Sequence, residues 1–346
     1  MVIARDYSNQ DSMKATKSKH RAETILPFEQ RLVELEEQLK RSNSAEEREG
    51  IERAIASEQA TVYPNLTPWE RVLLARHNDR PRMLDYVSRI FDDFIELHGD
   101  RAQGDDPAMV GGLAQFAGRT VVVYGQQKGA STDERVQRNF GMAHPNGYRK
   151  AMRLMDLAER FNYPIVSFVD TPAAHPGVEA EQWGQGPAIS KSILKSLSLK
   201  TPMLSVVIGE GGSGGALAIG VADRVAMFEH AVYVICPPER CAEILWRDVE
   251  QKELAASALR LTARELHGLG VIDAVLPEPR GGAHRSPDAA AQVLSEEILA
   301  FLEASDAGRW SVTDRQMKYR NMGVWLETAL HAVEEPAQVA DSGTGG

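Results

Sequence analysis

The chain has 346 residues, of which 43% are hydrophobic and 25% are charged, so it can bury a full core and is long enough for one large domain with an extension. Its formal net charge of −10 argues against an extended nucleic-acid footprint, because a surface that follows phosphates is normally basic. Two cysteines are too few for a disulfide framework or a structural zinc site, and no apolar stretch is long enough for a signal peptide or a membrane span. We therefore expect a globular cytoplasmic protein that binds neither membrane nor nucleic acid, with no metal ligands in this chain.

The first part of the chain predicts a helical arm over residues 25–98, after a polar flexible tail at 1–24. Between Pro27 and Gln59, leucines at helical spacing and a second charged stretch predict a helical hairpin, which either packs on the body or binds a partner. A third helical segment is predicted from Pro68 to His98.

From residue 99 to 305, strand-like and helix-like segments alternate, which is the pattern of an α/β domain. A helix with one apolar face is predicted around Ala151 to Phe161, a capping box at Thr262 opens another, and Ser286 with Pro287 starts the last. Residues 306–336 are predicted to form a C-terminal helical segment, and residues 337–346 a disordered tail. Five short, β-branched, apolar runs predict strands that are buried on both faces: Thr120–Gly125, Pro164–Val169, Met203–Ile208, Ala231–Cys236 and Val271–Val275.

Two unusual loops follow buried strands, at the strand ends where open α/β sheets bind ligands. In the first, Asp170–Gly177, two prolines and a glycine hold the backbone N–H groups of Ala173 and Ala174 in place, as an oxyanion site requires. The second, Gly209–Ala216, has five glycines in eight residues between a strand and a short helix, which is an anion-binding geometry.

The glycine loop also matches the dinucleotide pattern G-x-G-x-x-G, but too few residues follow Gly214 before the next apolar run for a Rossmann crossover. The alternative that these glycines only allow close packing stays open. Ser213 has no base placed for it, so we interpret it as a helix cap.

The sequence shows no catalytic triad, P-loop or paired carboxylates. His175 is the titratable group inside a candidate loop; it either packs and bonds to backbone or donates a proton near the reacting centre. A local cluster of basic residues indicates either a solvated face or a site for phosphates or an acidic partner domain: Lys128, Arg135, Arg138, Arg149, Lys150 and Arg153.

Several further motifs lie along the chain in a fixed order: Leu97-His-Gly-Asp-Arg101, Gly125-Gln-Gln-Lys-Gly129, Arg138-Asn-Phe-Gly-Met142, Gly147-Tyr-Arg-Lys-Ala151, Asp170-Thr-Pro, Gly209 to Gly220, Ile244-Leu-Trp246, and Pro277-Glu-Pro with Gly281-Gly-Ala-His-Arg285. Together they resemble the alpha subunit family of acetyl-CoA carboxylase carboxyltransferases. The resemblance is collinear from about Leu32 to His284.

The resemblance implies a crotonase-like fold, a spiral of strand-strand-helix units with an N-terminal helical extension. It implies transfer of the carboxyl group from carboxybiotin, which is attached to a carrier protein, to acetyl-CoA, giving malonyl-CoA for fatty acid synthesis. The implied partners are a zinc-ribbon beta subunit in an α2β2 assembly, the biotin carboxyl carrier protein and biotin carboxylase. The backbone amides of Gly214 and Gly215 are then expected to hold the biotin oxyanion, with substrate-binding roles for Gly211, Gly212, Ala173, Ala174, His175, Lys128 and Arg149.

The chain departs from the family pattern around this expected site. Ala173 and His175 stand where the family usually has glycine and tyrosine, and alanine costs energy if that position needs a positive φ. Residues 181–188 and 237–241 also differ. Two alternatives therefore stay open: a divergent crotonase-like acyl-CoA enzyme and a non-catalytic homologue of the subunit.

Overall fold

The computed structural model describes residues 25–323. The predicted tails at 1–24 and 337–346 lie outside that range, as does the predicted helical segment from residue 324 onward. Within the described range, none of the helices is both long and apolar enough to cross a membrane.

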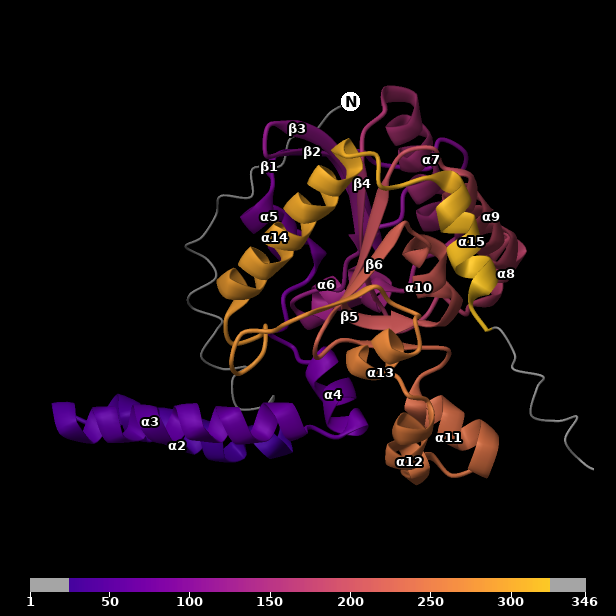
Figure 1. The fold of residues 1–346 in the computed structure, drawn as a ribbon. Coiled ribbons are helices and arrows are strands. Elements are labelled where there is room, and N and C mark those ends of the chain that lie inside the picture. Colours follow the sequence, from indigo (N-terminus) through magenta and orange to yellow (C-terminus); the bar gives the residue numbers. More distant parts are fainter. Residues whose placement is uncertain (1–24, 324–346) are drawn as a thin grey trace, which may run out of the picture.

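One eight-stranded sheet forms the centre of the molecule, in the order β1-β2-β3-β4-β5-β6-β8, with β7 paired to the end of β5 (Figure 1). The first three strands pair antiparallel, and all pairings from β3 onward are parallel. Every residue of β4 and β5 is buried, as expected for parallel strands covered on both faces. The strands are β1 Asp92–Glu96, β2 Met109–Phe116, β3 Arg119–Gln126, β4 Ile165–Thr171, β5 Met203–Gly212, β6 Arg224–Phe228, β7 Val232–Val234 and β8 Ala274–Leu276.

Three of the five predicted strands are confirmed as β3, β4 and β5, while β7 and β8 are shorter than predicted. The sequence did not predict β1, β2 or β6. In β2 the pair Gly111 and Gly112 had indicated a turn, but a side chain at Gly112 would overlap the carbonyl oxygen of Ile95 in β1. Glycine is there because the neighbouring strand approaches closely.

The prediction of one helical segment from Pro68 to His98 is wrong. Helix α4 (Pro68–Ala75) begins with a capping box at Thr67, and α5 (Met83–Ile90) follows a connection that contains Pro81. Met83, Tyr86 and Val87 of α5 lie in the main core, and β1 belongs to the sheet. Residues that the prediction assigned to the arm therefore pack with the body: α5 and β1, and also α4, whose Val72 and Ala75 contact the cluster that contains Val232.

Helices cover both faces of the sheet. Figure 1 shows α5 and α14 (Pro287–Asp306) on one side and α7 (Pro145–Phe161), α9 (Gln185–Ser198) and α15 (Val312–Asn321) on the other. In α7 the predicted apolar face is buried, except for Phe161 at its end. The remaining helices are α6 Thr132–Gln137, α8 Val178–Gln182, α10 Ser213–Gly220, α11 Pro238–Trp246, α12 Lys252–Ala258 and α13 Ala263–Gly268, with short 3-10 turns at Pro27–Glu29, Tyr63–Asn65, Asn139–Gly141 and Val249–Gln251.

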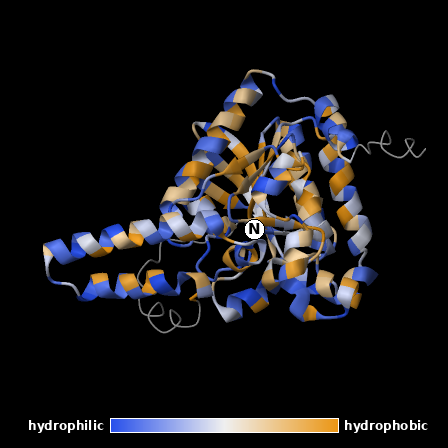
Figure 2. Cartoon of the chain, turned by 60° about the horizontal axis from the view of Figure 1, so that its bottom comes forward, coloured by the Kyte–Doolittle hydropathy of each residue, from blue (hydrophilic) through white to orange (hydrophobic). Residues whose placement is uncertain are grey.

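The predicted hairpin is formed by α2 (Gln30–Arg41) and α3 (Ala45–Val62), which project from the body (Figure 1). Figure 2 shows the two helices as largely hydrophilic, and α3 buries none of its residues. Only the inner end packs on the body, through a small core that includes Leu32 and Leu74.

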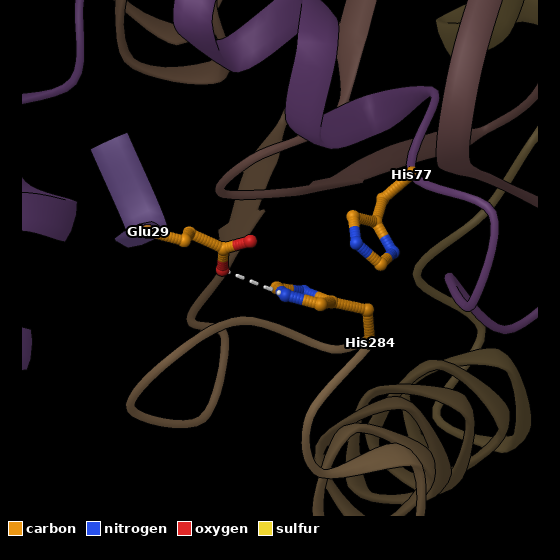
Figure 3. Close-up of side chains that lie close together, drawn as sticks. All are labelled: Glu29, His77 and His284. Atoms are coloured by element: carbon orange, nitrogen blue, oxygen red, sulfur yellow. Dashed lines mark hydrogen bonds and ion pairs between the residues drawn. The ribbon is translucent and has the colours of Figure 1, made fainter. Parts of the chain in front are cut away.

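A buried polar cluster fastens the inner end of the arm to the body. Glu29, at the start of the arm, accepts a hydrogen bond from the ring of His284 at 2.9 Å (Figure 3). It also accepts a hydrogen bond from Tyr63 and pairs with Arg285 at 3.2 Å. Burial alone would raise the pKa of Glu29, but these partners outweigh it and lower the pKa to about 2. The carboxylate is therefore charged at neutral pH and fixes the direction in which the hairpin leaves the body.

Candidate active site

The parallel strands β3, β4 and β5 end at one edge of the sheet, and both candidate loops begin there. The structure corrects the second of them. Gly209 to Gly212 are the last four residues of β5, fully buried, and α10 begins at the next residue. The backbone therefore passes from strand to helix within a single residue, and the predicted glycine loop does not exist as a loop.

That single residue is Ser213, whose φ of 54° lies in the left-handed region. A non-glycine residue is strained in this conformation and persists only where its surroundings enforce it. No side-chain cap bond is present at this helix start, so the interpretation of Ser213 as a helix cap is wrong.

The loop after β4 lies directly against the start of α10. A side chain at Gly212 would overlap the carbonyl oxygen of Pro172, and one at Gly215 would lie 2.6 Å from the carbonyl carbon of Ala173. These two glycines therefore permit contact between two backbones, which no other residue would allow. Gly214 has more room, since an added methyl would meet only Ile189, at 3.7 Å.

Three backbone amides are unsatisfied where the two segments meet. The amides of Gly214 and Gly215 belong to the first turn of α10, where helical N–H groups have no partner within the helix. Together with the amide of Ala174, they donate no hydrogen bond to any other described residue. The amide of Ala173, by contrast, is taken by the Thr171 hydroxyl at 3.3 Å.

Gln126 supports this arrangement, although the sequence indicates no role for it beyond its place in the motif Gly125-Gln-Gln-Lys-Gly129. Its side chain is fully buried, donates to the carbonyl of Gly215 at 3.0 Å and accepts from the amide of Asp170 at 3.1 Å. It thus ties α10 to the end of β4. An amide side chain at the end of a buried strand is the sequence feature that could have indicated this role of Gln126.

His175 is not available as a proton donor. Asn139 donates through Nδ2 both to the carbonyl of Met142, at 2.7 Å, and to Nδ1 of His175, at 2.9 Å. Because Nδ1 must accept, the ring proton sits on Nε2 and is donated to Glu179 at 2.7 Å. Both nitrogens of the histidine ring are thus engaged, by the side chains of Asn139 and Glu179 rather than by the backbone.

Lys128 lies between two carboxylates at the same sheet edge. Its ammonium group is 2.8 Å from Asp170 and 2.7 Å from Glu210, and Arg76 pairs with Glu210 at 2.6 Å. Burial alone would lower the pKa of Lys128 and raise that of Glu210, but the opposite charges dominate, raising the first and lowering the second to about 2. The lysine charge is therefore already neutralised by the protein.

Most residues of the predicted basic cluster are bound by other groups of the protein. Lys150 is fully buried and pairs with Asp105, while Arg153 donates to backbone carbonyls. Arg149 donates to the side chain of Gln103 and to the carbonyl of Trp183. The six residues therefore do not form one shared positive surface, because most of them bind carboxylates or carbonyl groups within the protein.

Within residues 25–323, two side-chain groups combine potential metal ligands: Glu29, His77 and His284 (Figure 3), and His144, His175 and Glu179. In the first, Nδ1 of His77 accepts from the amide of Asp79 at 3.1 Å, so the ring proton must sit on Nε2. In the second, both nitrogens of His175 are engaged as described. In each group, one histidine is therefore engaged in hydrogen bonds within the protein.

Comparison with known proteins identifies the kind of molecule. A family model described as "Acetyl co-enzyme A carboxylase carboxyltransferase-like" matches residues 22–323. An acetyl-coenzyme A carboxylase carboxyl transferase subunit alpha from Thermus thermophilus is 52% identical over 307 residues, which cover 88% of this chain and 97% of that protein. The protein of the same name from Acaryochloris marina is 49% identical over 317 residues, which also cover 88% of this chain and 97% of that protein.

Among solved structures, the beta subunit of geranyl-CoA carboxylase from P. aeruginosa is similar, with a TM-score of 0.51 at 18% identity. The match covers 70% of this chain and 46% of that one, so the chain spans about half the length of that subunit. At this identity the likeness concerns the fold alone, and it confirms the crotonase-like α/β fold expected from the sequence.

Proposed function

The chain belongs to the family of acetyl-CoA carboxylase carboxyltransferase alpha subunits, and we propose that it forms the half of a carboxyltransferase active site that holds carboxybiotin. The observation that carries this proposal is the convergence of unsatisfied amides where the loop after β4 meets the start of α10. Fixed N–H groups at a helix start are suited to an oxygen that becomes negatively charged.

The residues present fit the ureido group of biotin. The amides of Gly214, Gly215 and Ala174 would face its oxygen. When bound, carboxybiotin supplies the carboxyl group and, after giving it up, the base for the acyl-CoA. The protein side then needs oriented dipoles rather than an acid or base, and each such donor typically lowers the barrier by about 3–4 kcal/mol.

Within this proposal, Gly211 and Gly212 set the path of the strand that leads to the amides, and Gln126 fixes the position of Gly215. Ser213 holds the sharp turn into the helix. Lys128 acts on the site only through the two carboxylates that it holds, and His175 acts through the loop that it fastens.

The family names imply further subunits. We propose that a beta subunit supplies the acetyl-CoA side of the site in an α2β2 assembly, that biotin arrives on its carrier protein after carboxylation by biotin carboxylase, and that the product is malonyl-CoA for fatty acid synthesis in the cytoplasm. The comparisons do not favour a different crotonase-like enzyme or a non-catalytic homologue.

The test is reconstitution. The chain is mixed with a beta subunit from the same source, and malonyl-CoA is followed with carboxylated biotin carrier protein and acetyl-CoA. We expect turnover from the mixture and none from either subunit alone. Turnover by this chain alone, or an inactive mixture that nevertheless assembles, would contradict the proposal.

A further inference from the structure

A basic cavity of about 180 Å³ lies at the sheet edge beside the candidate active site. It is formed by the connection between α4 and α5, the segment after β3, α6 and the ends of β4 and β5. Five cationic side chains line it, against two carboxylates: Arg76, Arg80, Arg82, Lys128 and Arg135 against Asp170 and Glu210. The proposed carboxyl transfer assigns nothing to this cavity.

Three of the five cations have close carboxylate partners. Lys128 is held by two carboxylates, as described above, and Arg76 pairs with Glu239 at 2.5 Å in addition to Glu210. Arg80 is buried and pairs with Glu278 at 2.5 Å. These charges are balanced within the protein.

The other two, Arg82 and Arg135, are poorly balanced. Arg82 is only 9% exposed, yet its nearest carboxylate, Asp85, is 3.8 Å away. Arg135 forms no ion pair with any described residue; it donates to the carbonyl of Gly129 at 3.1 Å and to the side-chain oxygen of Asn78 at 2.7 Å. Both guanidinium groups donate to Asn78, Arg82 to its backbone carbonyl. A charge in a poorly solvated position is costly unless it is well paired, so the long ion pair of Arg82 and the lack of an ion pair at Arg135 among the described residues favour an anion in this cavity.

The electrostatics of Arg135 agree with this geometry. Its pKa is lowered from the ordinary value, first by burial and then by the positive charge of Arg82. Two like charges thus oppose each other across the wall of the cavity. An anion between them would remove that repulsion.

A strained segment closes one side of the cavity. Asn139, Phe140 and Gly141 follow one another with φ values of 46°, 54° and 78°, all in the left-handed region. Through this run the Phe140 side chain, 47% exposed, lines the cavity. Strain of this kind concentrates at ligand sites, and an aromatic wall beside two guanidinium groups reduces the access of water to a bound anion.

We propose that this cavity binds a phosphate group of a small-molecule ligand, with the guanidinium groups of Arg82 and Arg135 as its charge partners. Guanidinium groups match phosphate oxygens in paired, charge-assisted hydrogen bonds. The cavity has room for a phosphate or a pyrophosphate group. The ligand is either a free phosphorylated anion or the phosphate portion of a larger molecule such as coenzyme A.

The test measures binding without turnover, so it does not depend on the proposed function. Pyrophosphate is titrated into the full-length chain by calorimetry at constant ionic strength, and Arg135→Gln is compared with Arg138→Gln. Arg138 follows α6 but pairs with Glu134, at 2.9 Å, and does not line the cavity. We expect the dissociation constant to rise about tenfold or more in Arg135→Gln and to stay unchanged in Arg138→Gln.

Competition by coenzyme A separates the two sources. If coenzyme A displaces pyrophosphate from the wild type, the phosphate is part of the larger molecule; if it does not, the ligand is a free anion. Thermal melting of both variants confirms that they are folded, and Arg135→Lys, which keeps the charge but loses the paired geometry, should bind with intermediate affinity. No saturable binding of millimolar pyrophosphate, or equal affinity in Arg135→Gln and the wild type, overturns the proposal.

Discussion

Replacing Gly215 by alanine tests the central contact of the candidate active site. The added methyl would lie 2.6 Å from the carbonyl carbon of Ala173 and nearer still to the amide of Ala174, whereas ordinary contacts begin at 3.4 Å. The nearest of these atoms, the amide nitrogen of Ala174, would be 2.4 Å away, so the loop and α10 must separate by about 1 Å, and displacements of about 1 Å in a catalytic arrangement can cost about 100-fold in rate. Overpacking of this kind also destabilises by about 1–3 kcal/mol.

The assay is malonyl-CoA formation by the reconstituted complex, with urea unfolding of the isolated chain measured in parallel. The matched control is Gly186→Ala, since that glycine is exposed in α9 and an added methyl would meet nothing within 4 Å. We expect the control to keep wild-type activity and stability. If Gly215→Ala kept both the wild-type rate and the wild-type stability, the close approach of the two backbones would not exist; if only the rate were unchanged, the amides would not be the catalytic donors.

Three further predictions concern buried charges. Glu29→Gln should lower the free energy of unfolding by about 3 kcal/mol at neutral pH. Because the pKa of Glu29 is lowered to about 2 in the folded state, the carboxylate stabilises the fold fully above pH 4.5, and this stabilisation is lost as the pH falls towards 2. Urea unfolding at several pH values should show this loss of stability in the wild type and not in the variant. Lys128→Gln should cost a similar amount, because Asp170 then loses its ammonium partner and faces Glu210, which keeps its ion pair with Arg76; urea unfolding measures the loss, and unchanged stability at pH 7 would contradict this. Arg315→Ala should release α15 and cost about 3–5 kcal/mol, since its buried guanidinium pairs with Asp223 and caps three carbonyls; hydrogen exchange confined to α15 is the readout.

The parts of the fold that the sequence predicted are those whose pattern is local. The strands β3, β4 and β5 are continuous apolar runs, and the capping box at Thr262 starts α13 as predicted. The strand β2 was missed because its glycines are explained only by the closeness of β1, which is a tertiary contact. The glycine segment of β5 was taken for a loop because its strand pairing depends on β7, which lies further along the chain.

The charged residues show the same limit. The run from Lys128 to Arg153 is basic in sequence, but its counterions come from distant segments: Asp105 for Lys150, and Asp170 and Glu210 for Lys128. Sequence proximity therefore overestimated the local field. The phosphate cavity, conversely, needs Arg82 from one segment and Arg135 from another, and no local pattern joins them.

The departures from the family pattern in the loop after β4 are compatible with this arrangement. Ala173 is not among the described residues with positive φ, so alanine costs no backbone strain where the family usually has glycine. The ring of His175 forms hydrogen bonds with Asn139 and Glu179, which hold the loop in place. The amides are therefore placed by backbone contact at Gly212 and Gly215, not by the side chains that differ. Because a catalytic arrangement of amides requires only that the backbones stay in contact, changes in loop side chains should alter the rate far less than a single methyl group at Gly215.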